Sequence, residues 1–531
     1  MTPLAVHIKH AGKVHDVELD PDLPPAAFKE AVYQVTGVPI DRMKVMIKGG
    51  VLKDDTDWKK VAPKAGQTFM VIGAAGELPK PPEKPVVFLE DMNESEMARA
   101  LAMPVGLRNL GNTCYMNATV QAMRAIPELR IALGTSFPLD VLPKALRDLY
   151  NTMSQTTESV VPAVFLNVLR QVVPQFSELD RSKAGMMSGY AQQADAEECW
   201  TQITNALKEV PGIDDSGCSV SGKKFVDQFM TGEMRRELKC DEDENEPPTI
   251  STERVLKIEC NISNTTNYML SGIMDALNQK VEKNSSFLMR EAIYSQTSRM
   301  SRLPSYLTVH VVRFAWRRDI AKKAKIMRKV KFSTEFDALD VVTPELAQKL
   351  TPVSRRLKEI EKERAERRKV RKRTKIAQSS APPPAASRSD MNVDEPQAAP
   401  TAAPGELEEE GVYRSRELAD LEGLVDPSLK EDFGCSVTGL YDLVAIVTHK
   451  GAQADAGHYI GFVKKSVFHG GNAMNGSASR PEKGFDEDDE DWYKFDDDKV
   501  SIFPKEKLGT IDGGGEDSSA YVLLYKSKSL G

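Results

Sequence analysis

The stretch GLRNLGNTCYMNATVQAM, residues 106–123, places a cysteine directly before a helical pattern. Met116, Val120 and Met123 repeat at the spacing of one helix face. We therefore expect Cys114 at or near a helix N-terminus, where unpaired N–H groups and the positive end of the helix dipole stabilise a thiolate. A cysteine at such a position is more often structural than catalytic when no base accompanies it, so the rest of the chain must supply one.

Seven histidines are available as the base. Three belong to an N-terminal unit, one lies in a Gly-rich loop, and His310 sits inside the apolar run YLTVHVVRF, where a core or sheet position is expected. His449 and His458 are left as candidates. His458 directly follows Gly457 and opens the strand-like run HYIGFVKK, a position from which a ring can project into a cleft.

A third group should accept a hydrogen bond from the imidazole and orient it. The run WYKFDDDKVSIF offers Asp496, Asp497 and Asp498 after an aromatic-rich strand. Three consecutive aspartates are ordinarily a solvated turn, but their place in the strand after His458 favours a functional role. Asn109, five residues before the cysteine, is a neutral amide donor that could stabilise an oxyanion.

The length and composition of the chain limit which cellular compartment and which class of protein are expected. The chain has 531 residues, so two or more domains are expected. Six scattered cysteines form no C-x-x-C pair, which argues against a disulfide framework and a zinc ribbon and favours the cytosol and the nucleus. The start of the chain lacks the pattern of a secretory signal, and no apolar run approaches a membrane span. The net charge of −7 does not suggest a dedicated nucleic-acid binder.

The first 75 or so residues predict a small unit of their own. Alternating apolar residues predict two strands, and Phe28, Val32 and Val35 then mark one helix face that ends at Gly37. Two further strand patterns follow. The order β-β-α-β-β at this length resembles ubiquitin and its β-grasp relatives, and a generic small α+β domain is the alternative. We assign a ubiquitin-like domain to residues 1–76 and a Pro-rich spacer to residues 77–102.

The remaining chain, residues 103–529, predicts one mixed α/β domain with two insertions. Residues 355–375 hold twelve Lys or Arg and four Glu, which could contact nucleic acid or serve as a nuclear address. We favour a solvated helix extension for this basic run. The Pro/Ala/Ser-rich segment after it cannot bury enough apolar surface to fold, so we place a disordered insertion at about 355–411. A Gly/Asn/Ser-rich stretch predicts a mobile loop at about 466–491.

Four motifs together resemble the ubiquitin-specific proteases. GLRNLGNTCYMNATVQAM resembles their cysteine box, YAQQADAEECW their Gln-Asp box, LPSYLTVHVVRF a strand of the body, and GHYIGFVKK with WYKFDDDKVSIF their histidine box. The motifs occur in the family's order over about 430 residues. The N-terminal unit points more narrowly to proteasome-associated ubiquitin carboxyl-terminal hydrolases. The resemblance implies an α+β chain, with a β-grasp ubiquitin-like domain and a papain-like cysteine protease fold built of fingers, palm and thumb.

The resemblance also implies roles for single residues. Cys114 matches the nucleophile, His458 the general base and Asp496 the residue that orients it, while Asp497 is the less favoured orienter. Asn109 matches the oxyanion donor. The implied reaction is attack of the Cys114 thiolate on the carbonyl of ubiquitin's last glycine, release of the lysine amine, and hydrolysis of the thioester by water.

Further residues match the groove for ubiquitin's C-terminal tail. Gln193 and Asp195 match the pair that borders it, and a carboxylate suits a tail that carries arginines. Tyr459 matches an aromatic residue that lines it. In the proteasome-associated members, surface loops lie over this groove until docking or ubiquitin moves them, and residues 450–457 correspond to one such loop. We therefore expect low activity for the free protein and higher activity on the proteasome.

The sequence departs from the family pattern at several points. Many members bind zinc through two C-x-x-C pairs, whereas Cys240 and Cys260 stand alone here, so no metal and no cofactor are expected. The Gln-Asp box carries Ala194 between its two polar residues, and Cys199 replaces a more usual aromatic or aliphatic residue. The second insertion lengthens the gap between the histidine and the aspartates.

The expected partners are ubiquitin, ubiquitinated proteins and the 26S proteasome regulatory particle, the last through the ubiquitin-like domain. No membrane partner is expected, and nucleic acid is disfavoured. Two other classes are alternatives: a catalytically silent ubiquitin-binding proteasome adaptor, and a nucleic-acid-associated protein that uses residues 355–375. Labelling of Cys114 by a ubiquitin probe with a reactive C-terminus would separate enzyme from adaptor.

Overall fold

The computed structural model of the chain divides into two compact units, Met1–Asp91 and Met92–Gly531. The structure describes residues 3–48, 50–54, 56–73, 103–135, 138–178, 194–317, 322–379, 408–452, 457–469 and 489–531. The predicted spacer, residues 77–102, lies outside the described residues. Among the described helices, none combines the length and apolar character needed to cross a membrane.

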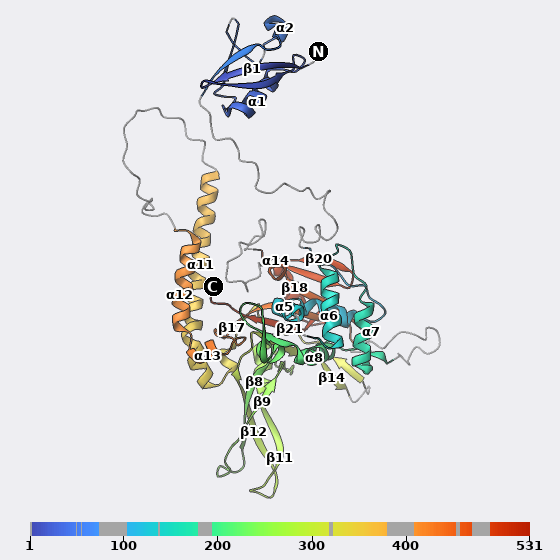
Figure 1. The fold of residues 1–531 in the computed structure, drawn as a ribbon. Helices are drawn as coiled ribbons and strands as arrows, with labels where there is room; N and C mark the ends of the chain where they lie inside the picture. The colour runs from blue at the N-terminus through green and yellow to red at the C-terminus, as the bar shows by residue number, and fades with distance from the viewer. Residues whose placement is uncertain are drawn as a thin grey trace, which may run out of the picture. The chain divides into compact units, whose positions relative to one another are not determined.

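The smaller unit is a five-stranded sheet with one main helix (Figure 1). The strand order is β2-β1-β5-β3-β4, in which β1 and β5 run parallel. This is the β-grasp arrangement that the sequence pattern predicts. Its elements are β1 (Leu4–His10), β2 (Lys13–Leu19), α1 (Pro25–Thr36), β3 (Lys44–Ile47), β4 (Gly50–Val51), α2 (Trp58–Val61) and β5 (Thr68–Ile72).

Alternation along the strands gives this unit its core. Val6 and Ile8 of β1 and Phe69 of β5 point to one side, where Phe28 and Val32 of α1 cover them. Gly37 ends α1 in the left-handed conformation at φ 68°, and its N–H donates to the Tyr33 carbonyl. A glycine adopts this conformation without the steric cost that a side chain would add.

The larger unit is built on an eight-stranded sheet. The strand order is β10-β13-β21-β17-β18-β19-β20, and β16 pairs with β17 outside that path. The strands are β10 (Ile258–Cys260), β13 (Tyr306–Val311), β16 (Glu335–Asp337), β17 (Leu440–Lys450), β18 (His458–Lys464), β19 (Trp492–Asp496), β20 (Lys499–Phe503) and β21 (Ser519–Ser527).

A group of helices covers one end of this sheet (Figure 1). They share one apolar core with the sheet, to which Leu129, Leu146, Phe165 and Trp200 contribute. The helices are α4 (Cys114–Met123), α5 (Pro127–Gly134), α6 (Val141–Met153), α7 (Ala163–Val172), α8 (Ala196–Ala206) and α9 (Phe225–Phe229). Short elements nearby are β6 (Pro211–Ile213) with β7 (Ser219–Lys224), β14 (Phe314–Arg317) with β15 (Lys322–Lys325), and α10 (Met269–Leu277).

A separate four-stranded sheet projects from this body as a narrow arm (Figure 1). Its order is β11-β12-β8-β9, and all neighbours are antiparallel. Its strands are β8 (Gly232–Cys240), β9 (Thr249–Val255), β11 (Asn278–Ser285) and β12 (Arg290–Arg302). At the outer end, the Glu246 carboxylate accepts hydrogen bonds from the hydroxyls of Ser285 and Tyr294, which ties the loop after β8 to the β11–β12 hairpin.

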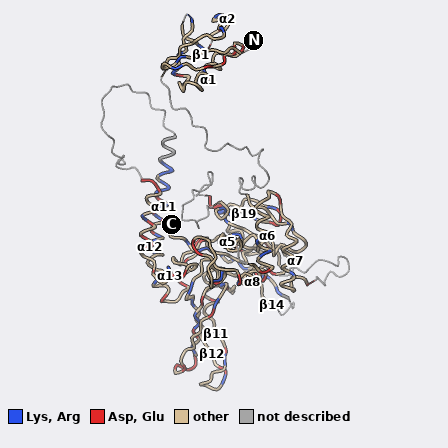
Figure 2. Tube along the Cα trace, viewed as in Figure 1, with Lys and Arg blue, Asp and Glu red and all other residues tan. Residues whose placement is uncertain are grey.

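The interpretation of residues 355–375 as a helix extension is confirmed, and the prediction of disorder at about 355–411 is wrong at both ends. Residues 355–379 belong to α11 (Pro344–Ser379), a helix of 36 residues that carries Lys and Arg along much of its length (Figure 2). The antiparallel helix α12 (Glu410–Leu424) packs against it, followed by α13 (Pro427–Glu431). Residues 380–407 lie outside the described part of the chain.

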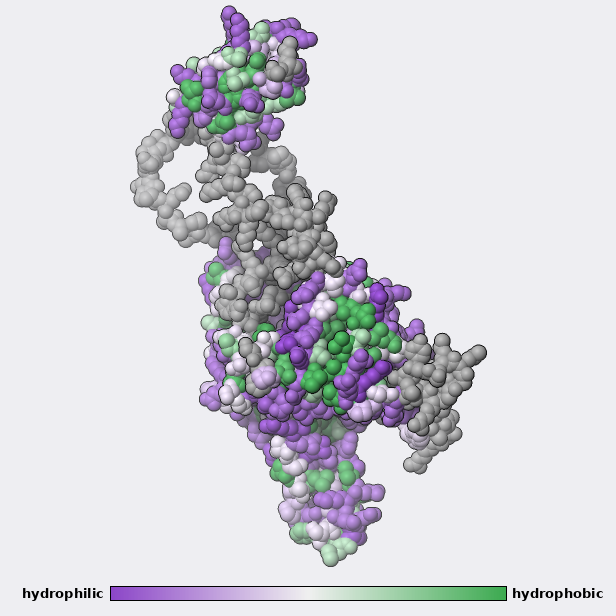
Figure 3. All heavy atoms as spheres, turned by 45° about the vertical axis from the view of Figure 1, so that its right-hand side comes forward, coloured by the Kyte–Doolittle hydropathy of each residue, from purple (hydrophilic) through white to green (hydrophobic). Residues whose placement is uncertain are grey.

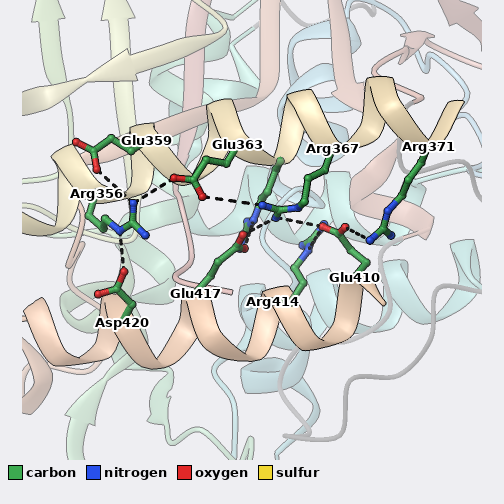
Figure 4. A network of polar contacts seen from close by, with 10 residues as sticks. Arg356, Glu359, Glu363, Arg367, Arg371, Glu410, Arg414, Glu417 and Asp420 are labelled. Carbon is green, nitrogen blue, oxygen red and sulfur yellow. Dashed lines mark hydrogen bonds and ion pairs between the residues drawn. The ribbon is translucent and has the colours of Figure 1, made fainter. Parts of the chain in front are cut away.

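The basic run is an ordered helix because α12, which comes much later in the chain, packs against it. The composition of the run alone does not show this partner. At the base of the hairpin, Leu357 and Ile360 of α11 pack against Leu421. Further along, ion pairs replace apolar contacts (Figure 4). The Glu417 carboxylate, buried between the helices, pairs with both Arg364 and Arg367.

Both ends of the loop predicted at about 466–491 belong to the described structure. Ser466–His469 form the short helix α14, and Phe468 packs against the main core. Residues 470–488 of the predicted mobile loop lie outside the described residues.

Candidate active site

Cys114 is the first residue of α4, as the sequence predicts. The chain reaches it through a turn in which Gly111 and Asn112 have φ of 97° and 54°. Asn109 braces this turn, because its side-chain oxygen accepts from the N–H groups of Gly111 and Thr113 at 2.9 and 3.2 Å. The cysteine side chain is 2% exposed and is not in a disulfide.

The histidine box brings His458 to this helix terminus. His458 begins β18, and β18 lies directly against α4. Gly461 allows the close approach, since an added Cβ would stand 3.2 Å from the Ala118 carbonyl oxygen. A hydrogen bond to Cys114 and a second to Asp496 raise the pKa of His458 to about 9, against the opposing effect of burial. The ring therefore holds its second proton through neutral pH.

Asp496, the predicted orienting residue, contacts this ring. His458 Nε2 and Asp496 Oδ1 are 2.6 Å apart. The other carboxylate oxygen, Oδ2, lies 3.1 Å from the Lys494 ammonium. Burial opposes ionisation of Asp496, but the hydrogen bonds from His458 and Lys494 outweigh it and hold the pKa of the carboxyl below its usual range. The structure thus brings Cys114, His458 and Asp496 together in one site.

Asp497 has a different partner from the one considered in the sequence. Its oxygens accept from Asn109 Nδ2 at 2.9 Å and from Asn117 Nδ2 at 2.8 Å. Its φ is 54°, a left-handed conformation that Asp tolerates better than most residues. Asp497 therefore fixes the amide of Asn109, the predicted oxyanion donor, and does not orient the imidazole. Sequence reasoning missed Asn117, whose only signal is its place in the same motif, three residues after the cysteine.

Of the predicted groove residues, the structure describes two. Asp195 is the N-cap of α8, and its carboxylate accepts from the Glu197 N–H and the Tyr521 hydroxyl, both at 2.7 Å. Burial raises the pKa of Asp195. Its carboxylate is thus engaged by this chain, whereas the sequence suggested a role toward arginines of a substrate. Gln193 lies outside the described residues.

Tyr459 is the second groove residue and is 1% exposed. Its ring lies 4.8 Å from that of His449 and 6.2 Å from that of Tyr521, and its hydroxyl has no hydrogen-bond partner among the described residues. His310 stacks edge-on against Tyr521, so it occupies the buried sheet position that the sequence predicts. Sequence reasoning missed Tyr521, because the strand that carries it has no motif of its own.

Cys240 and Cys260 lie in different sheets and are not joined to each other. Cys240 ends β8 and is buried with Ala292 and Tyr294, whereas Cys260 lies in β10 and donates to the Met269 carbonyl. Within the part of the chain that the structure describes, no group of three or more His, Cys, Asp or Glu residues is arranged to hold a metal ion.

Comparison with known families agrees with this geometry. The family model described as "Ubiquitin carboxyl-terminal hydrolase" matches residues 105–525. The chain belongs to the ubiquitin carboxyl-terminal hydrolase family. A second model, "Ubiquitin family", matches residues 6–75, which lie in the small unit.

Full-length relatives carry the same family name. "Ubiquitin carboxyl-terminal hydrolase 6" of Schizosaccharomyces pombe is 42% identical over 531 residues and covers 100% of both chains. A protein of the same printed name from Arabidopsis thaliana is 36% identical and covers 98% of each chain. "Ubiquitin carboxyl-terminal hydrolase 14" of Caenorhabditis elegans is 28% identical, over 99% of this chain and 94% of that protein. This hydrolase is accordingly a cysteine-type deubiquitinating peptidase with an N-terminal ubiquitin-like domain.

The family fold gives names to the parts of the larger unit. The projecting sheet is the fingers, the eight-stranded sheet the palm, and the helices around α4 the thumb. A cavity of about 790 Å³ opens where fingers and palm meet α8 and α9, and its lining includes Lys224, Asp227, Arg254 and Lys257. Lys257 also pairs with Glu197 at 2.6 Å, so the cavity reaches the helix that Asp195 caps. The hydrolase thus has a concave, charged surface beside α8.

The site can perform acyl transfer by nucleophilic catalysis. The Cys114 sulfur lies at a helix N-terminus and beside the His458 ring, where it is placed to act as the nucleophile. The same imidazolium is placed to donate its proton to a leaving amine and then to accept one from water. The Asn109 amide is held at the approach to Cys114, where a developing oxyanion needs a donor.

Proposed function

We propose that this hydrolase is a proteasome-associated deubiquitinase. It cleaves isopeptide bonds after the C-terminal glycine of ubiquitin on conjugates bound to the proteasome, and docking raises its activity. The observation that supports the proposal is that one chain holds both the Cys114–His458–Asp496 site and a separate ubiquitin-like unit with exposed apolar side chains. The relatives from Schizosaccharomyces pombe and Arabidopsis thaliana match this chain over 100% and 98% of both lengths, so the similarity includes the small unit and supports a shared role for it.

The docking face is the outer side of the small sheet. Met46, Met70 and Ile72 point away from the core, and the last two are each 52% exposed. In the sheet register Met70 lies between Met46 and Lys9, and Lys44 lies beside Ile72. Apolar and hydrophilic side chains are mixed on the surface of this unit (Figure 3). An exposed apolar patch with a basic rim is typical of a protein–protein interface.

The chemistry follows from the residues of the site. The Cys114 thiolate attacks the carbonyl carbon of the terminal glycine, and the oxyanion takes a hydrogen bond from Asn109. His458 then gives its proton to the lysine amine, which leaves as the C–N bond breaks. Water, deprotonated by His458, attacks the thioester and releases ubiquitin with a free C-terminus.

The link from docking to activity is proposed to run through the strand that carries the base. The chain between Lys450 of β17 and His458 of β18 is short, and its first residues are bonded to neighbouring segments: the Gly451 N–H donates to the Glu516 carbonyl at 2.7 Å. A change in this connection would reach His458 directly. We therefore expect proteasome binding to alter kcat as well as substrate delivery.

The test compares turnover of a fluorogenic ubiquitin substrate with and without purified proteasome. We expect a rise on proteasome addition for the wild type, no turnover for Cys114→Ser, and loss of the rise but not of basal turnover for Met70→Glu. Leu23→Glu is the matched control, since Leu23 is 50% exposed but lies in the loop before α1. Equal turnover with and without proteasome would overturn the activation. Retained co-sedimentation of Met70→Glu with proteasome would overturn the docking face.

A further inference from the structure

Lys494 and Asp496 lie on the same face of β19. They are two residues apart in a strand, and side chains at this spacing point to the same side of a sheet. The two oxygens of Asp496 contact different cations: Oδ1 lies 2.6 Å from His458 Nε2, and Oδ2 lies 3.1 Å from Lys494 Nζ. The carboxylate is therefore held at both ends.

The strand itself is firmly placed. Trp492, the next residue on that face, is 1% exposed, and Lys494 is paired in register with Phe462 of β18 and Ser501 of β20. Lys494 is about one-third exposed, so its ammonium remains partly hydrated while its stem follows the sheet. The position of its charge depends on β19, the same strand that positions Asp496.

Other charged groups face Asp496 from the elements around it. These are His458 of β18 and Lys499 of β20, which stands opposite Asp496 in the register, while Cys114 and Asp497 act on His458 and not on Asp496 itself. Among the described residues, Asp496 makes ion pairs with His458 and Lys494, and none with Lys499. Lys499 is thus a more exposed lysine of the same hairpin that lacks the ion pair with Asp496.

We propose that Lys494 is a positioning residue for the deubiquitinating reaction, which acts by holding the second oxygen of Asp496 so that the first stays aligned with His458. It does not touch the reacting atoms. Without it, the Asp496 carboxylate can rotate about its terminal torsion, which is soft for Asp. The imidazolium would then lose a fixed orientation toward Cys114. Lys494 also favours the ionised form of the carboxyl, which the imidazolium requires.

The proposal rests on the assignment of Asp496 as the orienting residue, so the experiment tests the role of Lys494 separately from the role of Asp496. The variants are Lys494→Met, which keeps the stem and removes the charge, Lys494→Arg, which restores a cation, and Lys499→Met as the matched control. Asp496→Ala and the double variant Lys494→Met/Asp496→Ala complete a double-mutant cycle. Each is assayed with fluorogenic ubiquitin from pH 5 to pH 9, and thermal unfolding confirms that each variant is folded.

We expect Lys494→Met to lower kcat by about fivefold, the factor that corresponds to an ion pair of this exposure. We expect KM to stay unchanged and the acid limb of the kcat/KM profile to move to higher pH, because Asp496 loses a cation that favours its ionised form. Lys494→Arg should recover most of the rate. In the Asp496→Ala background, Lys494→Met should have no further effect.

Three results would overturn the proposal while leaving the role of Asp496 intact. These are an unchanged kcat and pH profile in Lys494→Met, an equal fall in Lys499→Met, and a fall in Lys494→Met that is fully additive with Asp496→Ala. Wild-type activity in Asp496→Ala would instead overturn the assignment on which the proposal depends.

Discussion

Replacing Asp497 by Asn should impair catalysis although Asp497 does not contact the imidazole. Its two oxygens accept from the amides of Asn109 and Asn117. Asn has the same shape and also tolerates the left-handed φ of 54°, so the backbone of the turn is preserved. One acceptor oxygen, however, becomes an NH₂ group that faces another NH₂ donor. The substitution therefore removes one charge-assisted hydrogen bond and weakens the other.

The magnitude follows from these two contacts. A hydrogen bond to a charged group contributes roughly 1.5–3 kcal/mol, and partial exposure of the Asn109 contact favours the lower end. A loss of about 2 kcal/mol that is felt wholly in the transition state lowers the rate by about 30-fold. The lost stabilisation applies to the transition state because Asn109 would bind the oxyanion, which the ground state lacks.

The assay is steady-state hydrolysis of fluorogenic ubiquitin by the free enzyme. Asp497→Asn should show the fall in kcat. Asp498→Asn, in the same turn, should stay within twofold of wild type, because Asp498 is exposed and the amides of Asn109 and Asn117 donate to Asp497 instead. A normal kcat for Asp497→Asn, or an equal fall in Asp498→Asn, would show that the fixed amide is not needed. Labelling of Cys114 by a small alkylating reagent should be unchanged, since the substitution leaves the contact between Cys114 and His458 intact.

Three other outcomes are expected. Since the folded pKa of His458 is raised to about 9, its charge stabilises the fold fully below pH 6.5 and progressively less as pH rises to 9. The difference in Tm between wild type and His458→Asn, measured by calorimetry, should therefore shrink between pH 6.5 and pH 9. A difference that grew over this range would contradict the raised pKa. Glu417→Gln leaves two guanidinium groups without their buried carboxylate and should destabilise the α11–α12 hairpin by about 3 kcal/mol. Amide hydrogen exchange in the two helices should become faster. Glu422 is exposed, so the control Glu422→Gln should leave the exchange unchanged. Gly106→Ala places a Cβ 2.4 Å from the Asp498 carbonyl oxygen and should lower kcat by displacing the Asp497 turn, a result that unchanged kinetics would refute.

The sequence predicted the small unit well because its signals are local. Alternation in β1 and β5, the helix face through Phe28 and Val32, and the Gly37 cap each depend on residues close in the chain. The same holds for Cys114 at the start of α4. Patterns of this kind report secondary structure directly, since period and caps are properties of one segment.

The sequence could not predict partners that come from distant segments. The basic run of α11 has no apolar periodicity strong enough to indicate a packed helix, and the residues that neutralise it, Glu410, Glu417 and Asp420, lie beyond the Pro-rich segment (Figure 4). For the same reason Asp195 appeared free to bind an arginine. Its actual partner, Tyr521, stands 326 positions later, on a strand without a recognisable motif.

The three consecutive aspartates show how one turn divides like residues among different tasks. Asp496 ends β19 and keeps the strand's orientation, so its carboxylate faces the ring of His458. Asp497 takes a positive φ, which turns its side chain toward Asn109 and Asn117, and Asp498 is left exposed before β20 begins at Lys499. The residue bonded to the predicted base and the residue bonded to the predicted oxyanion donor are therefore neighbours in one tight hairpin. Because a hairpin moves as a unit, a displacement of this turn would disturb both groups together, and the backbone contact of the Leu107 N–H with the Asp497 carbonyl at 3.0 Å ties that turn to the segment that leads to Cys114.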